Sequence, residues 1–186
     1  MYVAHSFPPT KAGDYGQKTF QQGVDYFSSF TGFGDQYDVV STEDKFLLNI
    51  AGHNFVGISD LILKDRETGK MIVIDHKTKS PSSMKNEIGL YRKQLYIYAE
   101  HVKQKYGIYP DEIRFNMIKS QNWIVEPFSL TRHQETLQWV EDMIDVISIE
   151  EEWLEQPNYY FCRYICPMLQ HCDEGQKFCR CIKKKK

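Results

Sequence analysis

The stretch MIVIDHKTK, residues 71–79, places four apolar residues directly before an aspartate, a histidine and a lysine. A short apolar run of this kind is typical of a buried β-strand, yet charged side chains are almost never fully buried unless they are paired. Side chains alternate between the two faces of a strand, so Asp75 and Lys77 are predicted to share one face and His76 to lie on the other. The stretch therefore predicts a strand that starts in a hydrophobic core and ends in a polar site.

Periodicity along the rest of the chain predicts the elements around this strand. Helical spacing marks 14–30, 87–106 and a segment that opens with a capping box at Thr131 to Gln134 and runs to about Trp153. Strand patterns mark 45–50, 55–63, 70–77, 113–118 and 123–128. This order predicts an α/β (α+β) protein with a central mixed β-sheet flanked by helices, in which the first three strands form an antiparallel meander.

The composition fits one globular domain. The chain has 186 residues, of which 41% are apolar, and a formal net charge of −2, so it can bury one substantial core. The apolar runs are too short for a membrane span, and the N-terminus lacks the pattern of a signal peptide. We therefore expect a soluble protein of the cytoplasm, and any binding of nucleic acid has to come from a local basic patch.

A second aspartate, Asp60, lies among apolar residues in the preceding predicted strand, so Asp60 and Asp75 can converge across the hairpin. Two half-buried carboxylates repel each other and lose hydration, which a divalent cation offsets, and hard oxygen ligands favour Mg²⁺ or Mn²⁺. A lysine beside such a cation, here Lys77, can act on a water molecule or on charge that develops on phosphorus. A single strand acid is more often part of a surface ion pair or a turn. From the residues alone both interpretations stay open.

Three motifs in a fixed order carry a resemblance to a known family. They are Gly57 to Asp60 (G-x-x-D), Asp75 to Lys77 ((D/E)-x-K) and Gln94 to Tyr98 (Q-x-x-x-Y). Over about residues 15–172 the chain resembles the PD-(D/E)XK nucleases, and within them the RecB-type exonuclease domains and the iron–sulphur CRISPR-adaptation nucleases with their phage relatives. The resemblance implies a restriction-endonuclease-like core and a metal-dependent DNA nuclease, an exonuclease, acting in DNA recombination, repair or phage DNA processing.

The resemblance also implies roles for the residues of the first two motifs. Asp60, Asp75 and the main-chain carbonyl of His76 would hold Mg²⁺ or Mn²⁺, and Lys77 would be the catalytic lysine. The imidazole of His76 would point away from the site and have a packing or DNA-facing role.

The third motif implies two further site residues. Gln94 and Tyr98 would lie on one helix face above the site, where they would orient the lysine or contact the DNA backbone. From spacing alone, an amide and a ring four residues apart in an apolar stripe are more often packed core groups. Glu43, just before the first predicted strand, is a candidate support for the site.

The cysteines form a second group, all of them near the C-terminus: Cys162, Cys166, Cys172, Cys179 and Cys181. An odd number crowded at one end suits a metal or cluster site better than a disulfide framework. The C-x3-C-x5-C spacing of the first three resembles the triplet that, in the iron–sulphur relatives, joins one upstream cysteine around a 4Fe–4S cluster. No cysteine precedes Cys162, so either Cys179 or Cys181 supplies the fourth ligand, or Zn²⁺ replaces the cluster, or the site is vestigial.

We expect residues 1–156 to form the nuclease core and residues 157–186 to form a Cys-rich segment with a lysine tail in the same domain. Relatives carry a histidine-bearing helix ahead of the matched region, whereas here His5 lies in a Pro-rich lead-in without that helical context. Two functions therefore stay open. One is a nuclease acting on linear duplex or single-stranded DNA in a bacterial or phage-infected cell, alone or with a recombination or CRISPR-adaptation partner. The other is a truncated or inactive nuclease fold that serves as a DNA-binding or assembly subunit.

Overall fold

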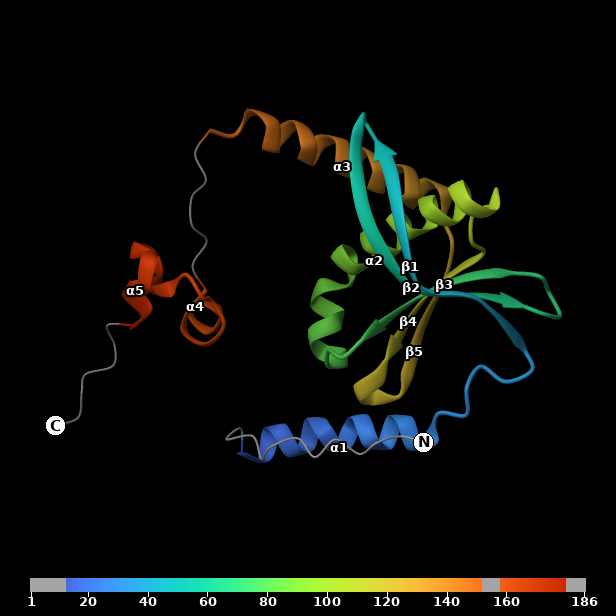
Figure 1. Cartoon of the computed structure of the whole chain (residues 1–186), viewed down its shortest axis with the longest axis horizontal. Coiled ribbons are helices and arrows are strands. Elements are labelled where there is room, and N and C mark those ends of the chain that lie inside the picture. The colour runs from blue at the N-terminus through green and yellow to red at the C-terminus, as the bar shows by residue number, and fades with distance from the viewer. Residues whose placement is uncertain (1–12, 152–157, 180–186) are drawn as a thin grey trace. The chain divides into compact units, whose positions relative to one another are not determined.

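A five-stranded mixed sheet forms the centre of the fold. The computed structural model of the chain describes residues 13–151 and 158–179, and the chain divides into two compact units, residues 1–143 and 144–186. The strands of the first unit, in spatial order, are β1 (Tyr37–Ile50), β2 (His53–Asp65), β3 (Met71–Lys77), β4 (Glu112–Met117) and β5 (Asn122–Pro127). Its helices are α1 (Gly13–Ser29), α2 (Pro81–Tyr106), the 3-10 turn η1 (Ile118–Ser120) and the part of α3 (Leu130–Ile149) that precedes residue 144 (Figure 1).

The strand directions confirm the predicted mixed sheet flanked by helices. The first three strands are antiparallel, β3 and β4 are parallel, and β4 and β5 are antiparallel again. A parallel pair needs a long crossover connection, and α2 provides it between β3 and β4.

Helix boundaries differ from the prediction where a cap decides them. Ser80 caps α2, because its side chain accepts a hydrogen bond from the N–H of Ser83, and Pro81 occupies the first turn. In α3 the Ser129 hydroxyl accepts the N–H of Arg132 at 3.4 Å, so the capping box predicted at Thr131 is wrong. The helix ends at Ile149, and the predicted end near Trp153 lies outside the described residues.

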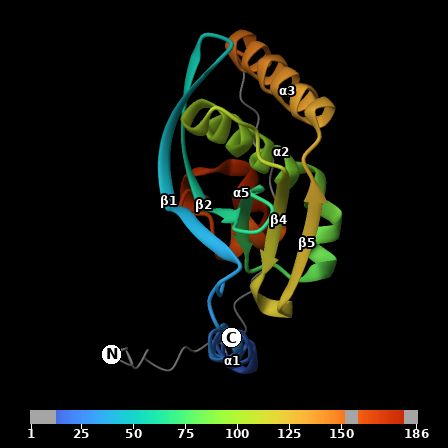
Figure 2. The same ribbon diagram turned by 90° about the vertical axis from the view of Figure 1, so that its right-hand side faces the viewer.

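The long β1–β2 ribbon extends beyond the rest of the sheet (Figures 1 and 2). Its turn is Ala51-Gly52, with φ values of 51° and 81°, the positive pair that a tight hairpin requires. Along the ribbon, a Cβ atom on Gly57 would lie 2.2 Å from the ring of its cross-strand partner Phe46. Glycine therefore allows the Phe46 ring to lie flat across β2.

Apolar side chains cover both faces of the sheet. On one face Leu61, Leu63, Ile72 and Ile74 form a buried cluster, with Phe33 and Tyr37 packed against it. The other face meets α2, which contacts β3 and β1 and buries Leu95 and Ala99 completely. The face of β3 that carries Asp75 and Lys77 is thus the face that α2 covers.

The second unit contains short helices: α4 (Tyr159–Tyr164), the 3-10 turn η2 (Leu169–His171) and α5 (Asp173–Cys179). Asn158 caps α4 by accepting the N–H of Phe161 at 3.1 Å.

No helix within the described residues combines the length and the apolar character that crossing a membrane requires.

Candidate active site

Strands β2 and β3 stop pairing directly before the two predicted metal-binding aspartates. The last pair is Leu61 with Ile74, and the same register places Asp60 opposite Asp75. Asp60 Oδ2 accepts the main-chain N–H of His76 at 2.8 Å, in place of a strand-to-strand hydrogen bond. The structure therefore brings Asp60 to the end of β3.

The main chain of His76 adds a further oxygen at this point. In an antiparallel strand the N–H and C=O of one residue face the same neighbouring strand. Since the N–H of His76 is directed to Asp60, its carbonyl oxygen faces the same side. Two carboxylates and one carbonyl thus border the place where β2 and β3 separate.

Asp75 is the most buried acid of this group, with 2% of the residue exposed. Lys77 Nζ lies 2.6 Å from Asp75 Oδ2, but this oxygen has no partner with hydrogen-bond geometry. The contact is therefore counted as an ion pair, and a carboxylate oxygen has a second lone pair that one such contact does not use. Burial raises the pKa of Asp75 above its ordinary value of 3.8 and outweighs the lowering by Lys77, while Asp60 adds repulsion in the same direction as burial.

The Lys77 ammonium group is held by three neighbours. Besides Asp75, it donates to Gln94 Oε1 at 3.1 Å and lies 4.5 Å from the centroid of the Tyr91 ring. Its side chain is 14% exposed. An ammonium fixed in this way is positioned beside the two aspartates and keeps access to solvent.

Gln94 and Tyr98 form the layer above the lysine. The amide nitrogen of Gln94 donates to Tyr98 Oη at 2.6 Å, which leaves its oxygen for Lys77. Burial raises the pKa of Tyr98, and the carboxylates of Asp75, Asp60 and Glu43 add to this. Tyr98 is therefore neutral, the residue is 7% exposed, and its hydroxyl orients Gln94.

These oxygen donors fit a hard divalent cation. Asp75 offers a buried oxygen without a hydrogen bond, and Asp60 and the His76 carbonyl lie at the same junction. Mg²⁺ and Mn²⁺ prefer this combination of carboxylate and carbonyl ligands. The candidate set is thus two carboxylates and a main-chain oxygen, and in the described part of the chain no three His, Cys, Asp or Glu side chains gather as a metal site.

The imidazole of His76 lies on the opposite face of β3. Its Nδ1 is 2.9 Å from the amide nitrogen of Asn116, which also lies 2.5 Å from the hydroxyl of Tyr26 in α1. The side chain thus packs between β4 and α1, away from Asp75 and Lys77.

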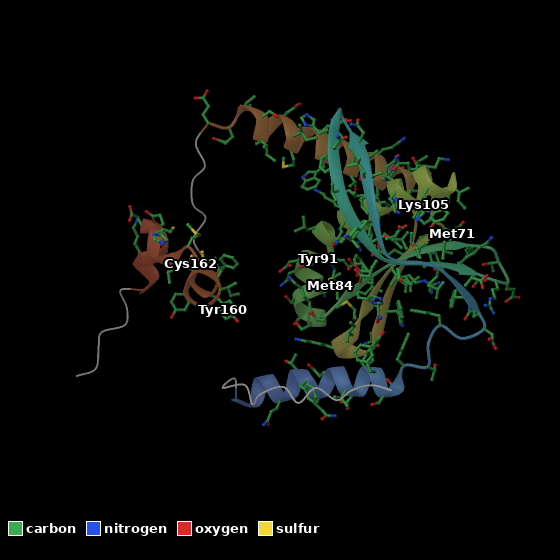
Figure 3. The ribbon with its side chains drawn as sticks, viewed as in Figure 1. Met71, Met84, Tyr91, Lys105, Tyr160 and Cys162 are labelled. Carbon is green, nitrogen blue, oxygen red and sulfur yellow. The ribbon has the colours of Figure 1, made fainter. Side chains whose placement is uncertain are left out.

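Tyr91 is a site residue that sequence reasoning missed. It lies on α2 (Figure 3), and its hydroxyl donates to Glu87 at 2.9 Å. Tyr91, Gln94 and Tyr98 are spaced three and four residues apart, which places them on one helix face. This spacing is the signal that could have identified Tyr91.

Glu43 lies within β1 rather than before the first strand. Its φ of 49° is unusual for a residue other than glycine, and the ladder skips it between Thr42, paired with Leu61, and Asp44, paired with Ser59. This register places Glu43 opposite Asp60. From the sequence Glu43 is only a weak candidate for the site, because apolar and polar residues do not alternate clearly around it.

Two of the hollows in the first unit can be compared with the candidate site. The larger, of about 610 Å³, is lined by Tyr26, Arg114, Asn116 and Trp123 on the α1 side of the sheet, and none of the predicted site residues lines it. The smaller, of about 430 Å³, is lined in part by Tyr91, Gln94 and Tyr98. The smaller hollow is therefore the one next to the candidate site.

The described cysteines do not form a comparable centre. Cys162 is buried in α4 (Figure 3), Cys166 and Cys172 are half-buried, and all three are free thiols. Cys172 Sγ accepts the N–H of Gly175 at 3.3 Å. The residues that the structure describes thus contain no assembled cluster or zinc site. The side chain of Cys179, Cys181, the lysine tail and His5 lie outside what is described.

Comparison with known proteins identifies the family. The model of the PD-(D/E)XK nuclease superfamily matches residues 12–173. The chain belongs to this superfamily. Membership agrees with the mixed sheet and implies a metal-dependent nuclease, a hydrolase that acts on DNA.

Other comparisons add little about this PD-(D/E)XK protein. No curated protein matches it. Among 15 matching chains of solved structures, one described as the crystal structure of SSO0001 is 20% identical, covers 83% of this chain and 71% of its own, and has a TM-score of 0.42.

Proposed function

We propose that this PD-(D/E)XK protein is a Mg²⁺- or Mn²⁺-dependent deoxyribonuclease that uses Asp60, Asp75 and Lys77. One observation supports this most. Lys77 is held between Asp75 and Gln94, beside the place where β2 and β3 stop pairing and the side chain of Asp60 accepts the main-chain N–H of His76. A structural ion pair would not need a glutamine and a tyrosine to orient its lysine.

Each side chain has a distinct task in this proposal. Asp60, Asp75 and the His76 carbonyl hold the cation, which supplies Lewis acidity toward a phosphate oxygen and a water molecule when it is bound. Lys77 positions the attacking water and balances the negative charge that develops on phosphorus. Gln94 holds the ammonium in place, and Tyr98 holds Gln94.

We further propose an exonuclease of the RecB type that acts in DNA recombination, repair or phage DNA processing, in the cytoplasm where such DNA is found. The three motifs in their order support this assignment, as does their likeness to the CRISPR-adaptation relatives. A recombination or CRISPR-adaptation protein is the corresponding partner.

The competing candidate is a nuclease fold that binds DNA without cutting it. The ion pair of Asp75 with Lys77 favours this candidate, because the ammonium already compensates the carboxylate at 2.6 Å. In that case the lysine would contribute to the stability of the fold instead of to catalysis.

For the C-terminal segment we propose a 4Fe–4S cluster on Cys162, Cys166, Cys172 and either Cys179 or Cys181, with Zn²⁺ as the alternative metal. We also propose that residues 1–156 and 157–186 belong to one domain, which the family match supports because it runs into the segment. Metal analysis after anaerobic purification separates iron with sulphide from one zinc ion. A metal-free protein would contradict both assignments.

Cleavage of end-labelled linear DNA in Mg²⁺ or Mn²⁺ tests the nuclease. We expect Lys77→Ala to lower the cleavage rate by at least about 10²-fold, in the range of a lost proton-transfer or charge-stabilising group. Lys64→Ala, which removes an exposed lysine from β2, is the matched control and should retain the wild-type rate. Cleavage by Lys77→Ala at the wild-type rate, with unchanged circular dichroism, would reject the role of Lys77, and a wild type that binds DNA but does not cleave it would favour the non-cutting fold.

A further inference from the structure

We propose that the hollow beside Lys77 binds one unpaired nucleobase of the DNA strand that is cut. This inference rests on the proposed nuclease function and adds a substrate class to it. The protein would act on single strands, overhangs or frayed ends in preference to blunt duplex.

The walls of the hollow are aromatic and apolar. The β1–β2 ribbon contributes Phe46 and Phe55, α2 contributes Leu90 and Tyr91, and α3 contributes Trp139. Its volume of about 430 Å³ lies within the usual range for small-molecule sites. Aromatic and apolar side chains from three elements suit the flat face of an aromatic ligand.

Two residues that contact Lys77 also line the hollow. Gln94, which binds Lys77 at 3.1 Å, and Tyr91, whose ring lies 4.5 Å from Lys77 Nζ, both line it. Adjacent nucleotides of one strand are only about 3.4 Å apart along a duplex axis. A phosphate at the two aspartates therefore brings its own or the next base to this opening.

Charge at the rim agrees with a nucleotide as the occupant. Lys93 lines the hollow, and its ammonium lies 3.7 Å from the centroid of the Trp139 ring. Aromatic side chains that stack on bases, combined with cations that follow the phosphates, are the usual chemistry of single-strand recognition. An apolar protein segment would not need the lysine.

The base has to be unpaired because its two faces and its edges are covered in a duplex. Enzymes that place a base in a pocket act on single strands or pay the energy of unpairing it. An already single-stranded nucleotide avoids that cost, which explains the expected preference for ends and overhangs.

Binding measured in Ca²⁺, in place of the catalytic metal, tests the hollow. A short fluorescent single-stranded oligonucleotide is compared with versions that carry one abasic nucleotide at each position in turn. We expect one abasic position to weaken wild-type binding by roughly 5- to 150-fold, the range of one lost base–aromatic stack. Trp139→Ala should weaken binding of the complete oligonucleotide by a similar factor. This variant should also bind the complete oligonucleotide and the version with the sensitive abasic position equally well.

Variants that keep the fold provide the controls. Trp139→Phe retains a stacking ring and should keep most of the difference between the two oligonucleotides. Leu90→Glu changes a 59% exposed residue of the hollow and should abolish the difference, whereas Leu47→Glu, at a 57% exposed position that does not line the hollow, should preserve it. The proposal is overturned if no abasic position matters in the wild type, or if Trp139→Ala weakens complete, abasic and duplex DNA alike, as expected of a surface covered by a protein segment.

The outcome is separable from that of the proposed function, since binding in Ca²⁺ requires no cleavage. A base-specific hollow in a protein that cuts nothing would support this inference and reject the nuclease. A protein that cleaves DNA but binds abasic and complete oligonucleotides equally well would support the nuclease and reject this inference.

Discussion

The two ends of the β2–β3 hairpin each contain a buried aspartate, and the two differ in how their oxygens are satisfied. At the turn end, Asp65 Oδ1 accepts the N–H groups of Glu67 and Thr68 at 3.0 and 2.8 Å. At the open end, Asp75 Oδ2 has a lysine nearby but no bond of proper geometry. One carboxylate stabilises a turn, and the other remains available to a ligand.

The pKa values of the two groups reflect this difference. Hydrogen bonds from Thr68, with help from Gln36 and Glu67, lower the pKa of Asp65 below 3.8, whereas burial raises that of Asp75. Groups with pKa values perturbed by desolvation are concentrated at functional sites. The comparison therefore singles out Asp75, and not Asp65, as the candidate functional acid.

The largest predicted effect is on DNA cleavage, which should depend on Asp75 but not on Asp65. Asp75→Asn should lower DNA cleavage by at least about 10²-fold, because it removes a ligand of the cation and the partner of Lys77. Asp65→Asn should leave the cleavage rate at the wild-type level in protein that is folded at the assay temperature. Similar losses in both variants would mean that Asp75 acts only through the stability of the fold.

Metal binding should sharpen the same comparison without any cleavage. A cation that binds only the folded state at 100 times its dissociation constant stabilises it by about 2.7 kcal/mol. We expect Mn²⁺ to raise the melting temperature of wild type and of Asp65→Asn, but not that of Asp75→Asn. Glu43→Gln, opposite Asp60 in the register, should show a smaller loss, since its carboxylate acts on the site from a distance.

The smallest effect is a pair of opposite pH dependences in metal-free protein. The raised pKa of Asp75 means that its ionised form costs stability, a cost that is absent below pH 3.8 and grows as the pH rises through the folded-state value. Asp75→Asn should therefore raise the melting temperature at neutral pH relative to the wild type, and this gain should disappear in acid.

Asp65 should behave in the opposite way. Its lowered pKa means that its contribution to stability is complete above pH 3.8 and is lost as the pH falls through the folded-state value. Asp65→Asn should therefore lower the melting temperature at neutral pH and approach wild type in strong acid. Thermal unfolding followed by circular dichroism across this pH range measures both variants, and equal signs at neutral pH would contradict the assigned difference.

Most of the fold was predictable because its signals are local. The alternation in residues 71–77 predicts both the buried strand β3 and the side on which Asp75 and Lys77 lie. The β1 strand starts earlier than predicted, at Tyr37, because pairing with β2 holds a segment whose own sequence does not alternate. The caps at Ser80 and Ser129 were missed because several polar residues compete at each helix start.

The sequence by itself determined the order of elements, the candidate residues Asp60, Asp75, Lys77, Gln94 and Tyr98, and the face of β3 that carries the chemistry. The elements and the face of β3 follow from periods of two and of 3.6 residues, which depend on the backbone alone, whereas Gln94 and Tyr98 are candidates only through the resemblance of the three motifs to the nuclease family. The tertiary structure decided that Asp60 bonds to the end of β3, that Tyr91 borders the lysine, and that Trp139 closes a hollow beside it. Such contacts join segments far apart in the chain, and the packing of α2 and α3 against the sheet brings them together.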